Sequence, residues 1–421
     1  MLNAIGIVFL ALVSLNVVVE LILTILNLRH LKSKAGELPD VLREHIDEKT
    51  YHRSTAYNAD LGRLEIVETA VSFVLIIYFV YGGGFARIDA LARTIDSEGR
   101  YLAALVFGAS IFLIKFVADL PVSLYETFVV EERYEFNRMK PGLYSADCLK
   151  SLAVAAVIGI PVYLGMLWFM AATGVLWWFW CWCFVVVVQV TLLIVFPVWI
   201  APLFNKFVPL EEGNLKNQII SLANHVGFPA QGIFVMDGSK RSRHSNAYFS
   251  GFGKKKRIIL FDTLVRRLAS SHILAVLAHE FGHYKMHHLR KLLLVNSTAS
   301  LVILFGLSRL FHLEGFYPGF GFIYPSHYAA LAIVAVGAPS LSFLATPFFS
   351  MVSRRFEYQA DDYALGVLAT PRAMAEVIVF LTKDNLANTN PHPWYSFFHY
   401  SHPGPTERIN ALQQRIEQGQ R

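Results

Sequence analysis

Seven apolar stretches constrain the fold of this chain more than any other feature of its sequence. Each is long enough to cross a bilayer as a helix, which takes about 20 mainly apolar residues. They cover residues 4–28, 65–84, 101–124, 151–172, 175–199, 292–312 and 328–351. The composition agrees, because 55% of the 421 residues are hydrophobic, only 16% are charged and the mean hydropathy is +0.45. We therefore predict a mainly helical, multi-pass membrane protein.

The distribution of Lys and Arg predicts the orientation of these spans. No Lys or Arg precedes the first stretch, whereas the polar segment 29–64 carries seven. By the positive-inside rule, the N-terminus lies outside and this segment lies in the cytoplasm. Alternation then places residues 200–290 and the tail 352–421 on the cytoplasmic side, with the arginines of the loop 85–100 as the one exception. Orientation also explains the net charge of +6, so we expect a lipid bilayer and no nucleic acid as partner.

The polar segments divide the chain into four parts. These are spans one to five, a polar block, spans six and seven, and a C-terminal segment, at residues 1–199, 200–290, 291–351 and 352–421. In the polar block we predict a helix and then three short strands, the second of them an edge strand. Their expected positions are residues 215–226, 232–236, 245–249 and 257–261.

The polar block ends on the pattern His279-Glu280-Phe281-Gly282-His283, within a run that we predict to be helical from about Ser271. His279 and His283 then lie one turn apart on one face, so both imidazoles can reach one metal ion, as zinc requires. Glu280 points to a neighbouring face, where it can take a proton from a hydrolytic water. We expect Gly282 to leave room for substrate or metal. The alternative is a helix with two incidentally spaced histidines, since the pattern arises by chance in roughly 2 of 100 such chains.

A catalytic zinc ion usually has three protein ligands, so one more is needed. The best candidate is Glu357, which follows the last span. Asp361 lies one helical turn further on, where it can accept a hydrogen bond from a ligand imidazole and fix its tautomer. The alternative is a solvated acidic turn.

Two features inside the spans carry further predictions. Lys115 and Asp119 lie one turn apart in the third span, and indicate either a polar internal cavity or a pair that neutralises itself. Pro339 and Pro347 should kink the last span.

Four motifs follow one another along the chain. They are Ser245-Asn246-Ala247-Tyr248-Phe249-Ser250-Gly251-Phe252, the pattern at 279–283, Phe356-Glu357-Tyr358-Gln359-Ala360-Asp361, and Tyr400-Ser401-His402-Pro403 followed by Glu407-Arg408-Ile409. Together they resemble the Ste24 family of zinc-dependent CAAX prenyl proteases, over nearly the whole chain. The likeness departs at Gly404, where a second proline is expected.

The resemblance implies a seven-helix membrane barrel around a large chamber, closed on one side by a zincin-like metalloprotease domain with a small β-element. It implies one Zn²⁺ per chain and cleavage of the tripeptide after a prenylated cysteine. The implied roles are zinc ligands His279, His283 and Glu357, general base Glu280, substrate or intermediate contacts Asn246 and His402, and supports Asp361 and Arg408.

Those last two contacts are also reasonable physically. His402 could donate a hydrogen bond to developing negative charge, although a turn histidine is the alternative. Asn246, beside an edge strand, could fix an extended peptide by strand addition, although an Asx turn is the alternative.

We predict an integral-membrane zinc metalloendopeptidase acting on a peptide or protein, with its site on the cytoplasmic side. A broad-specificity quality-control protease is a second hypothesis, and a zinc-containing transporter or receptor without turnover is a third. Intramembrane proteolysis is disfavoured, because Arg266, Arg267 and Arg290 flank the zinc helix. The sequence sets no oligomeric state.

Overall fold

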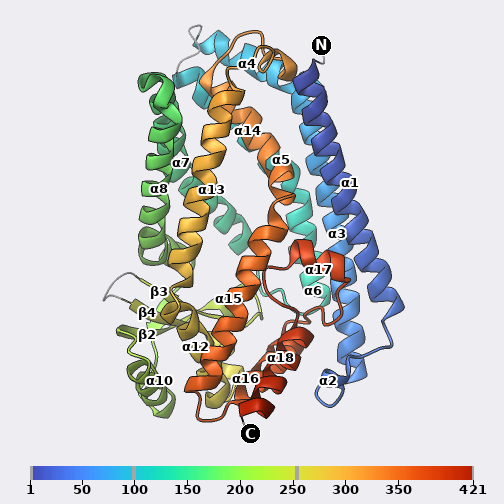
Figure 1. The fold of residues 1–421 in the computed structure, drawn as a ribbon, viewed down its shortest axis with the longest axis vertical. Coiled ribbons are helices and arrows are strands. Elements are labelled where there is room, and N and C mark those ends of the chain that lie inside the picture. Colours follow the sequence, from blue (N-terminus) through green and yellow to red (C-terminus); the bar gives the residue numbers. More distant parts are fainter. Residues whose placement is uncertain (1–2, 97–100, 252–255, 420–421) are drawn as a thin grey trace.

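The computed structural model describes residues 3–96, 101–251 and 256–419, and within them the chain is mainly helical with one small sheet. In Figure 1 the long helices fill the upper part of the molecule, with the N-terminus at their upper end. The sheet, the shorter C-terminal helices and the C-terminus lie at the lower end. The predicted mainly helical class is confirmed.

Within the described residues, five helical runs are long and apolar enough to cross a bilayer. They are α1 (Ala4–Ser33), a run Tyr101–Arg133, α7 (Pro141–Ala172), a run Gly174–Phe204 and α13 (His288–Leu310). The two composite runs contain π-helical turns, and they are built from α5 (Tyr101–Tyr125), η1 (Glu126–Val130), α6 (Glu131–Arg133), η2 (Gly174–Leu176), α8 (Trp177–Val195), η3 (Phe196–Ile200) and α9 (Ala201–Phe204). Between 6% and 22% of the most apolar part of each run is buried inside the protein, so most of its side chains are left uncovered by the rest of the described chain.

Two bent helix pairs supply the remaining predicted spans. Helix α3 (Glu48–Val80) meets α4 (Gly84–Ile95) at 57°, and α14 (His327–Phe343) meets α15 (Thr346–Val367) at 60°. If each pair is one span, the total is the predicted seven.

The break between α14 and α15 is the kink predicted for the last span. Pro339 lies inside α14, and Pro347 lies in the first turn of α15. A first-turn proline is compatible with a helix start, because the N–H that it lacks has no partner there. Helix α15 then continues without a break across residue 351. One continuous helix therefore connects the end of the last span to Glu357.

The polar block forms a four-stranded sheet in the order β1-β2-β4-β3. Its strands are β1 (Phe207–Pro209), β2 (Ala230–Met236), β3 (Ala247–Ser250) and β4 (Lys256–Phe261). The strands β2 and β4 are parallel, and the outer pairings are antiparallel. The helix α10 (Asn214–His225) and the strands β2, β3 and β4 confirm the predicted elements, with β3 at an edge. The three-residue β1 was not predicted, and part of the basic group after β3 lies outside the described residues.

Helix α12 (Ser270–Lys285) packs one face against the sheet. The ring of Phe281 is fully buried, and its centroid lies 4.7 Å from that of Phe249 on β3 and 5.0 Å from that of Phe228. The remaining short α-helices of the described chain are α2 (Asp40–Arg43), α11 (Asp262–Arg267), α16 (Arg372–Asp384), α17 (Pro393–His399) and α18 (Pro405–Gly419). An apolar core thus fixes one side of the helix that carries the zinc pattern.

The intramembrane pair Lys115 and Asp119 forms as a local contact. The Lys115 Nζ atom lies 2.5 Å from both carboxylate oxygens of Asp119, one helical turn away on α5. The two side chains therefore neutralise each other, as one of the two predicted alternatives requires.

Candidate metal centre

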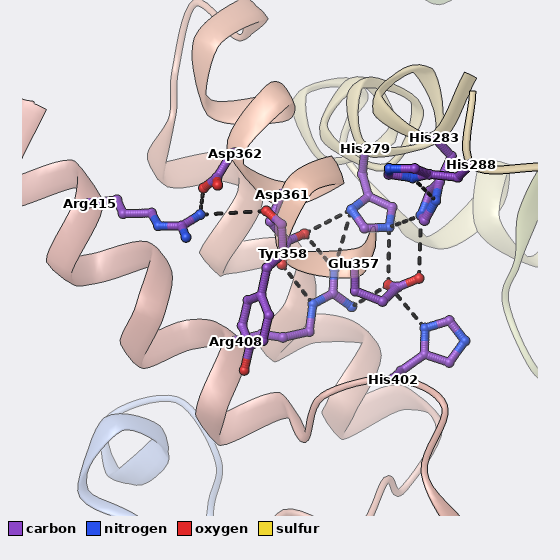
Figure 2. A network of polar contacts seen from close by, with 10 residues as sticks. All are labelled: His279, His283, His288, Glu357, Tyr358, Asp361, Asp362, His402, Arg408 and Arg415. Carbon is purple, nitrogen blue, oxygen red and sulfur yellow. Dashed lines mark hydrogen bonds and ion pairs between the residues drawn. The ribbon is translucent and has the colours of Figure 1, made fainter. Parts of the chain in front are cut away.

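Two histidines and one glutamate converge where α12 meets α15, as Figure 2 shows. The Nε2 atoms of His279 and His283 lie 3.4 Å and 3.3 Å from the two carboxylate oxygens of Glu357. These two Nε2 atoms are 3.1 Å apart. Ligand atoms of all three residues lie within 4.8 Å of one another, and no other such group occurs in the described part of the chain. The three side chains predicted to bind a metal are therefore brought together.

The hydrogen bonds behind these side chains show that the site fits a cation. The Nδ1 atom of His279 lies 2.8 Å from Asp361 Oδ1, and a carboxylate only accepts, so Nδ1 must donate its proton there. A neutral His279 then directs the lone pair of Nε2 toward the Glu357 carboxylate, which also carries only lone pairs. Such a convergence is repulsive unless a cation lies among the atoms. Two imidazoles and a carboxylate are a donor set that zinc commonly takes.

The pKa of His279 reflects the same demand for positive charge. Burial alone lowers this pKa, but the hydrogen bonds to Asp361 and Glu357 outweigh burial and raise the pKa to about 9. The two carboxylates therefore favour positive charge at His279.

Asp361 is itself held by Arg408 from α18. The guanidinium donates two hydrogen bonds to the carboxylate, from Nε to Oδ2 at 2.9 Å and from Nη2 to Oδ1 at 2.7 Å. Only 1% of Asp361 is exposed. A bidentate pair of this kind fixes the carboxylate, and the carboxylate fixes the ring of His279. The structure therefore brings Asp361 against His279 and Arg408 against Asp361.

Glu280 occupies the position on α12 directly after His279 and is partly buried. Burial raises the pKa of its carboxyl above the ordinary value, while the charges of His279 and His283 act in the opposite direction. A carboxylate with a raised pKa accepts a proton more readily near neutral pH.

His402 and Asn246 differ in how close they come to this group. His402 reaches Glu357 from the loop between α17 and α18, with its Nδ1 atom 3.0 Å from Oε2, and 64% of its side chain is exposed. Asn246 is exposed just before β3, and its side-chain oxygen accepts a hydrogen bond from the backbone N–H of Ala247 at 2.8 Å. That contact is to the adjacent residue, whereas an Asx turn is closed by the N–H two residues further on. The structure therefore brings His402, but not Asn246, against a predicted ligand.

Gly282 has a different role from the predicted one. A Cβ atom at this position would lie 2.8 Å from the Cα atom of Ala360 and 3.0 Å from its carbonyl oxygen. The prediction that Gly282 leaves room for substrate or metal is therefore wrong, because the backbone of α15 takes that space. Since Ala360 follows Glu357 by three residues, this close approach brings the carboxylate within reach of the two imidazoles.

His288 is a residue of the site that the sequence analysis missed. Its Nδ1 atom lies 3.0 Å from Nδ1 of His283, and only 2% of the residue is exposed. It opens α13 after His287, whose φ of 56° is in the left-handed region. A change of direction between two helices leaves no periodic signal in the sequence.

Comparison with known proteins agrees with this geometry. Residues 27–206 match the family described as CAAX prenyl protease N-terminal, five membrane helices, and residues 209–416 match peptidase family M48. The chain is 35% identical over 408 residues to CAAX prenyl protease 1 of Saccharomyces cerevisiae, covering 90% of this chain and 89% of the relative.

This chain belongs to peptidase family M48, among the CAAX prenyl proteases. The human CAAX prenyl protease 1 homolog is 30% identical over 437 residues, covering 91% of this chain and 90% of the relative. The crystal structure of S. mikatae Ste24p matches with a TM-score of 0.89 and 34% identity, covering 97% of this chain and 99% of that one. The family resemblance noted in the sequence is confirmed, and this M48 peptidase is an integral-membrane metallopeptidase.

The contact at Gly282 gives a first testable expectation. We expect Gly282→Ala to lower the stability of the protein by about 1–3 kcal/mol, because the added carbon meets backbone atoms of α15 that cannot rotate away. Metal affinity should fall with it, since Glu357 moves with Ala360. Thermal unfolding and metal titration of the detergent-solubilised protein measure both effects.

Gly366 is a matched control on α15, because a Cβ atom there meets nothing within 4 Å. Gly366→Ala should leave metal affinity unchanged and leave stability equal or raised by about 0.5–1 kcal/mol. Equal stability and metal affinity of Gly282→Ala and the wild type would contradict the assigned role of Gly282.

Proposed function

We propose that this M48 peptidase is a Ste24-type zinc endopeptidase that cleaves near the C-terminus of its substrates, after a prenylated cysteine. The observation that carries the proposal is the convergence of the His279 and His283 Nε2 atoms on the Glu357 carboxylate. The same chain matches CAAX prenyl proteases over at least nine tenths of its length.

In this proposal, His279, His283 and Glu357 hold one Zn²⁺ per chain. When bound, zinc polarises the carbonyl of the scissile bond and makes water acidic enough to be deprotonated near neutral pH. Glu280 accepts the proton of the attacking water and passes it to the nitrogen of the leaving amine. His402 donates a hydrogen bond to the negative charge that develops on the carbonyl oxygen. Asp361 and Arg408 keep His279 in the tautomer that leaves its Nε2 lone pair free.

The edge strand β3 offers a binding position for the substrate backbone. Strand β3 pairs with β4 on one side and has no partner strand on the other within the described residues. Phe249 on β3 stacks on Phe281 of α12, so the strand with the open edge packs against the helix that carries Glu280. A peptide added to β3 would lie extended with Asn246 near the start of the strand, where an amide can bind its backbone.

The membrane helices are consistent with the proposal that the substrate carries a lipid. We propose that they surround a chamber that receives the prenyl group, so that the cysteine next to it is delivered to the site. Each buried CH₂ of such a chain contributes about 0.8 kcal/mol, which favours prenylated over unmodified peptides.

We also propose that the N-terminus lies outside and the metal centre on the cytoplasmic side, with the four-part division of the chain predicted above. The positive charges of the arginines in the 85–100 loop disagree with this orientation. An ion pair within α4 accounts for one of them. There Arg93 Nε lies 3.0 Å from Oδ2 of the buried Asp89, so this charge is neutralised within the fold. Arg100 lies outside the described residues.

Replacing Glu280 tests the proposed reaction. Glu280→Gln should keep zinc, because Glu280 is not a ligand, and should slow cleavage of a farnesylated peptide by about 100- to 10,000-fold. Metal analysis and a cleavage assay on the same preparation measure both, with exposed Glu376→Gln on α16 as the control.

Three other results would contradict parts of the proposal. Full cleavage by Glu280→Gln would exclude Glu280 as the base. Wild-type protein that holds zinc but does not cleave the peptide would favour the transporter or receptor hypothesis. Equal cleavage of farnesylated and unmodified peptides would favour the quality-control protease.

Replacing His402 separates a reaction role from a metal role. We expect His402→Ala to lower kcat by about 100- to 1,000-fold while the metal content stays the same, because this residue donates to charge that forms during the reaction. The exposed His225→Ala on α10 is the control. If His402→Ala instead loses zinc, then His402 acts by holding Glu357 and not as a donor to the substrate.

Site-directed labelling tests the orientation. In a chain whose three cysteines are replaced by serine, a cysteine at exposed Glu211 should react with an impermeant maleimide only in inside-out vesicles. A cysteine at exposed Glu314, in the loop after α13, should react only in right-side-out vesicles. The reverse pattern would overturn the proposed topology.

A further inference from the structure

We propose that His288 is a positioning residue that fixes the tautomer and the ring orientation of the metal ligand His283. The inference rests on the metal site proposed above. The two Nδ1 atoms are 3.0 Å apart, and His288 is almost fully buried, with 2% of its surface exposed. Figure 2 shows the His288 ring against His283, on the side away from Glu357.

A single assignment of protons satisfies every contact in this chain of groups. The Nε2 atom of His283 faces Glu357 and His279, so it is the metal-binding atom and carries no proton. The proton of the neutral ring is then on Nδ1, which donates to Nδ1 of His288. His288 must accept there, which places its own proton on Nε2. That Nε2 atom lies 2.9 Å from Oε1 of Gln359, an acceptor.

The surroundings hold the His288 ring in one orientation. The ring stacks on Phe356 with centroids 4.2 Å apart and planes 8° apart. Phe356 and Gln359 come from the same turn of α15 as Glu357. His288 therefore links a ligand on α12 to the helix that carries the third ligand, so that moving one helix would disturb both.

The two histidine ligands are thus supported by groups of different charge. His279 donates to the carboxylate of Asp361, whereas His283 donates to a neutral imidazole. Arg408 offsets the negative charge of Asp361. A second carboxylate in place of His288 would add negative charge behind His283 and would reduce the positive charge that a bound divalent ion offers the substrate carbonyl. A neutral acceptor orients His283 without that reduction.

Two substitutions separate the hydrogen bond from simple packing. His288→Phe keeps a ring against Phe356 but removes the acceptor, which leaves the Nδ1–H of the partly buried His283 without its partner. His288→Asn removes the ring, but its side-chain oxygen can occupy the position of Nδ1 and accept the same hydrogen bond. The adjacent exposed His287→Asn is the control, since asparagine tolerates the left-handed backbone at that position.

The experiment measures zinc affinity by competition with a chelator, together with the visible absorption spectrum of the cobalt(II)-substituted protein. We expect His288→Phe to weaken zinc binding by about 10- to 100-fold and to alter the cobalt spectrum, as loss of a group behind a ligand does. His288→Asn should remain within about threefold of the wild type, and His287→Asn should be unchanged. Thermal unfolding of the metal-free proteins checks that each variant folds.

Each other outcome has a distinct meaning. If His288→Phe binds zinc like the wild type, or if Phe is tolerated and Asn is not, His288 acts by packing and the inference is wrong. If neither variant folds without metal, Gln359→Leu replaces them and should weaken zinc binding, because the proton on His288 is then free to move to Nδ1. Unchanged affinity in that variant would also overturn the inference. If wild-type protein binds no zinc, the proposed function itself fails.

Discussion

The close approach of α12 and α15 is the contact on which the rest of this site depends. Gly282 and Ala360 meet with no space for a side chain on the glycine, and both residues are buried. Because His283 follows Gly282 directly and Glu357 lies one turn before Ala360, this contact sets the distance between the imidazoles and the carboxylate. Two membrane helices separate these residues in the sequence, so the metal centre exists only when those helices are in place.

The electrostatics of the site follow from that contact. Once the helices touch, lone pairs of two histidines and one carboxylate point at a common position, and a cation becomes necessary. The Arg408 guanidinium does not supply this cation, because it pairs with Asp361 and its Nη1 atom lies 4.0 Å from Oε2 of Glu357. Positive charge is therefore needed where the Nε2 atoms and the Glu357 carboxylate meet.

Local periodicity in the sequence was enough to predict many of the parts. The spacing of His279 and His283, the one-turn spacing of Glu357 and Asp361, and the lengths of the apolar runs are properties of single helices. The edge strand near Asn246 follows from alternation over a few residues in the same way. Each of these predictions depends on neighbours within one element, which the sequence displays directly.

Contacts between elements were predicted much less well. Gly282 suggested open space, but only the structure shows that Ala360 occupies it. His288 gave no signal, because its role depends on a turn at His287 and on Gln359 from another helix. Strand β1 was missed because three residues ending in proline carry too little alternation to indicate a strand. The family resemblance supplied Arg408 and His402, whose positions no helical spacing could give.

The bend between α14 and α15 explains how a membrane span can deliver a ligand. A straight helix through residues 327–367 would carry Glu357 along the direction of α14, away from α12. The 60° bend occurs at Leu344 and Ala345, just before Pro347. Pro347 lacks a backbone N–H, but in the first turn of α15 this costs little stability, because that N–H would have no partner within the helix. Eleven residues, 346–356, then separate Ala345 at the bend from Glu357, all of them in the continuous helix α15. A change of angle at this bend would displace Glu357 by a large distance, because the ligand lies several turns further along α15. The packing of Gly282 against Ala360 must therefore fix the orientation of α15, which the bend alone does not determine.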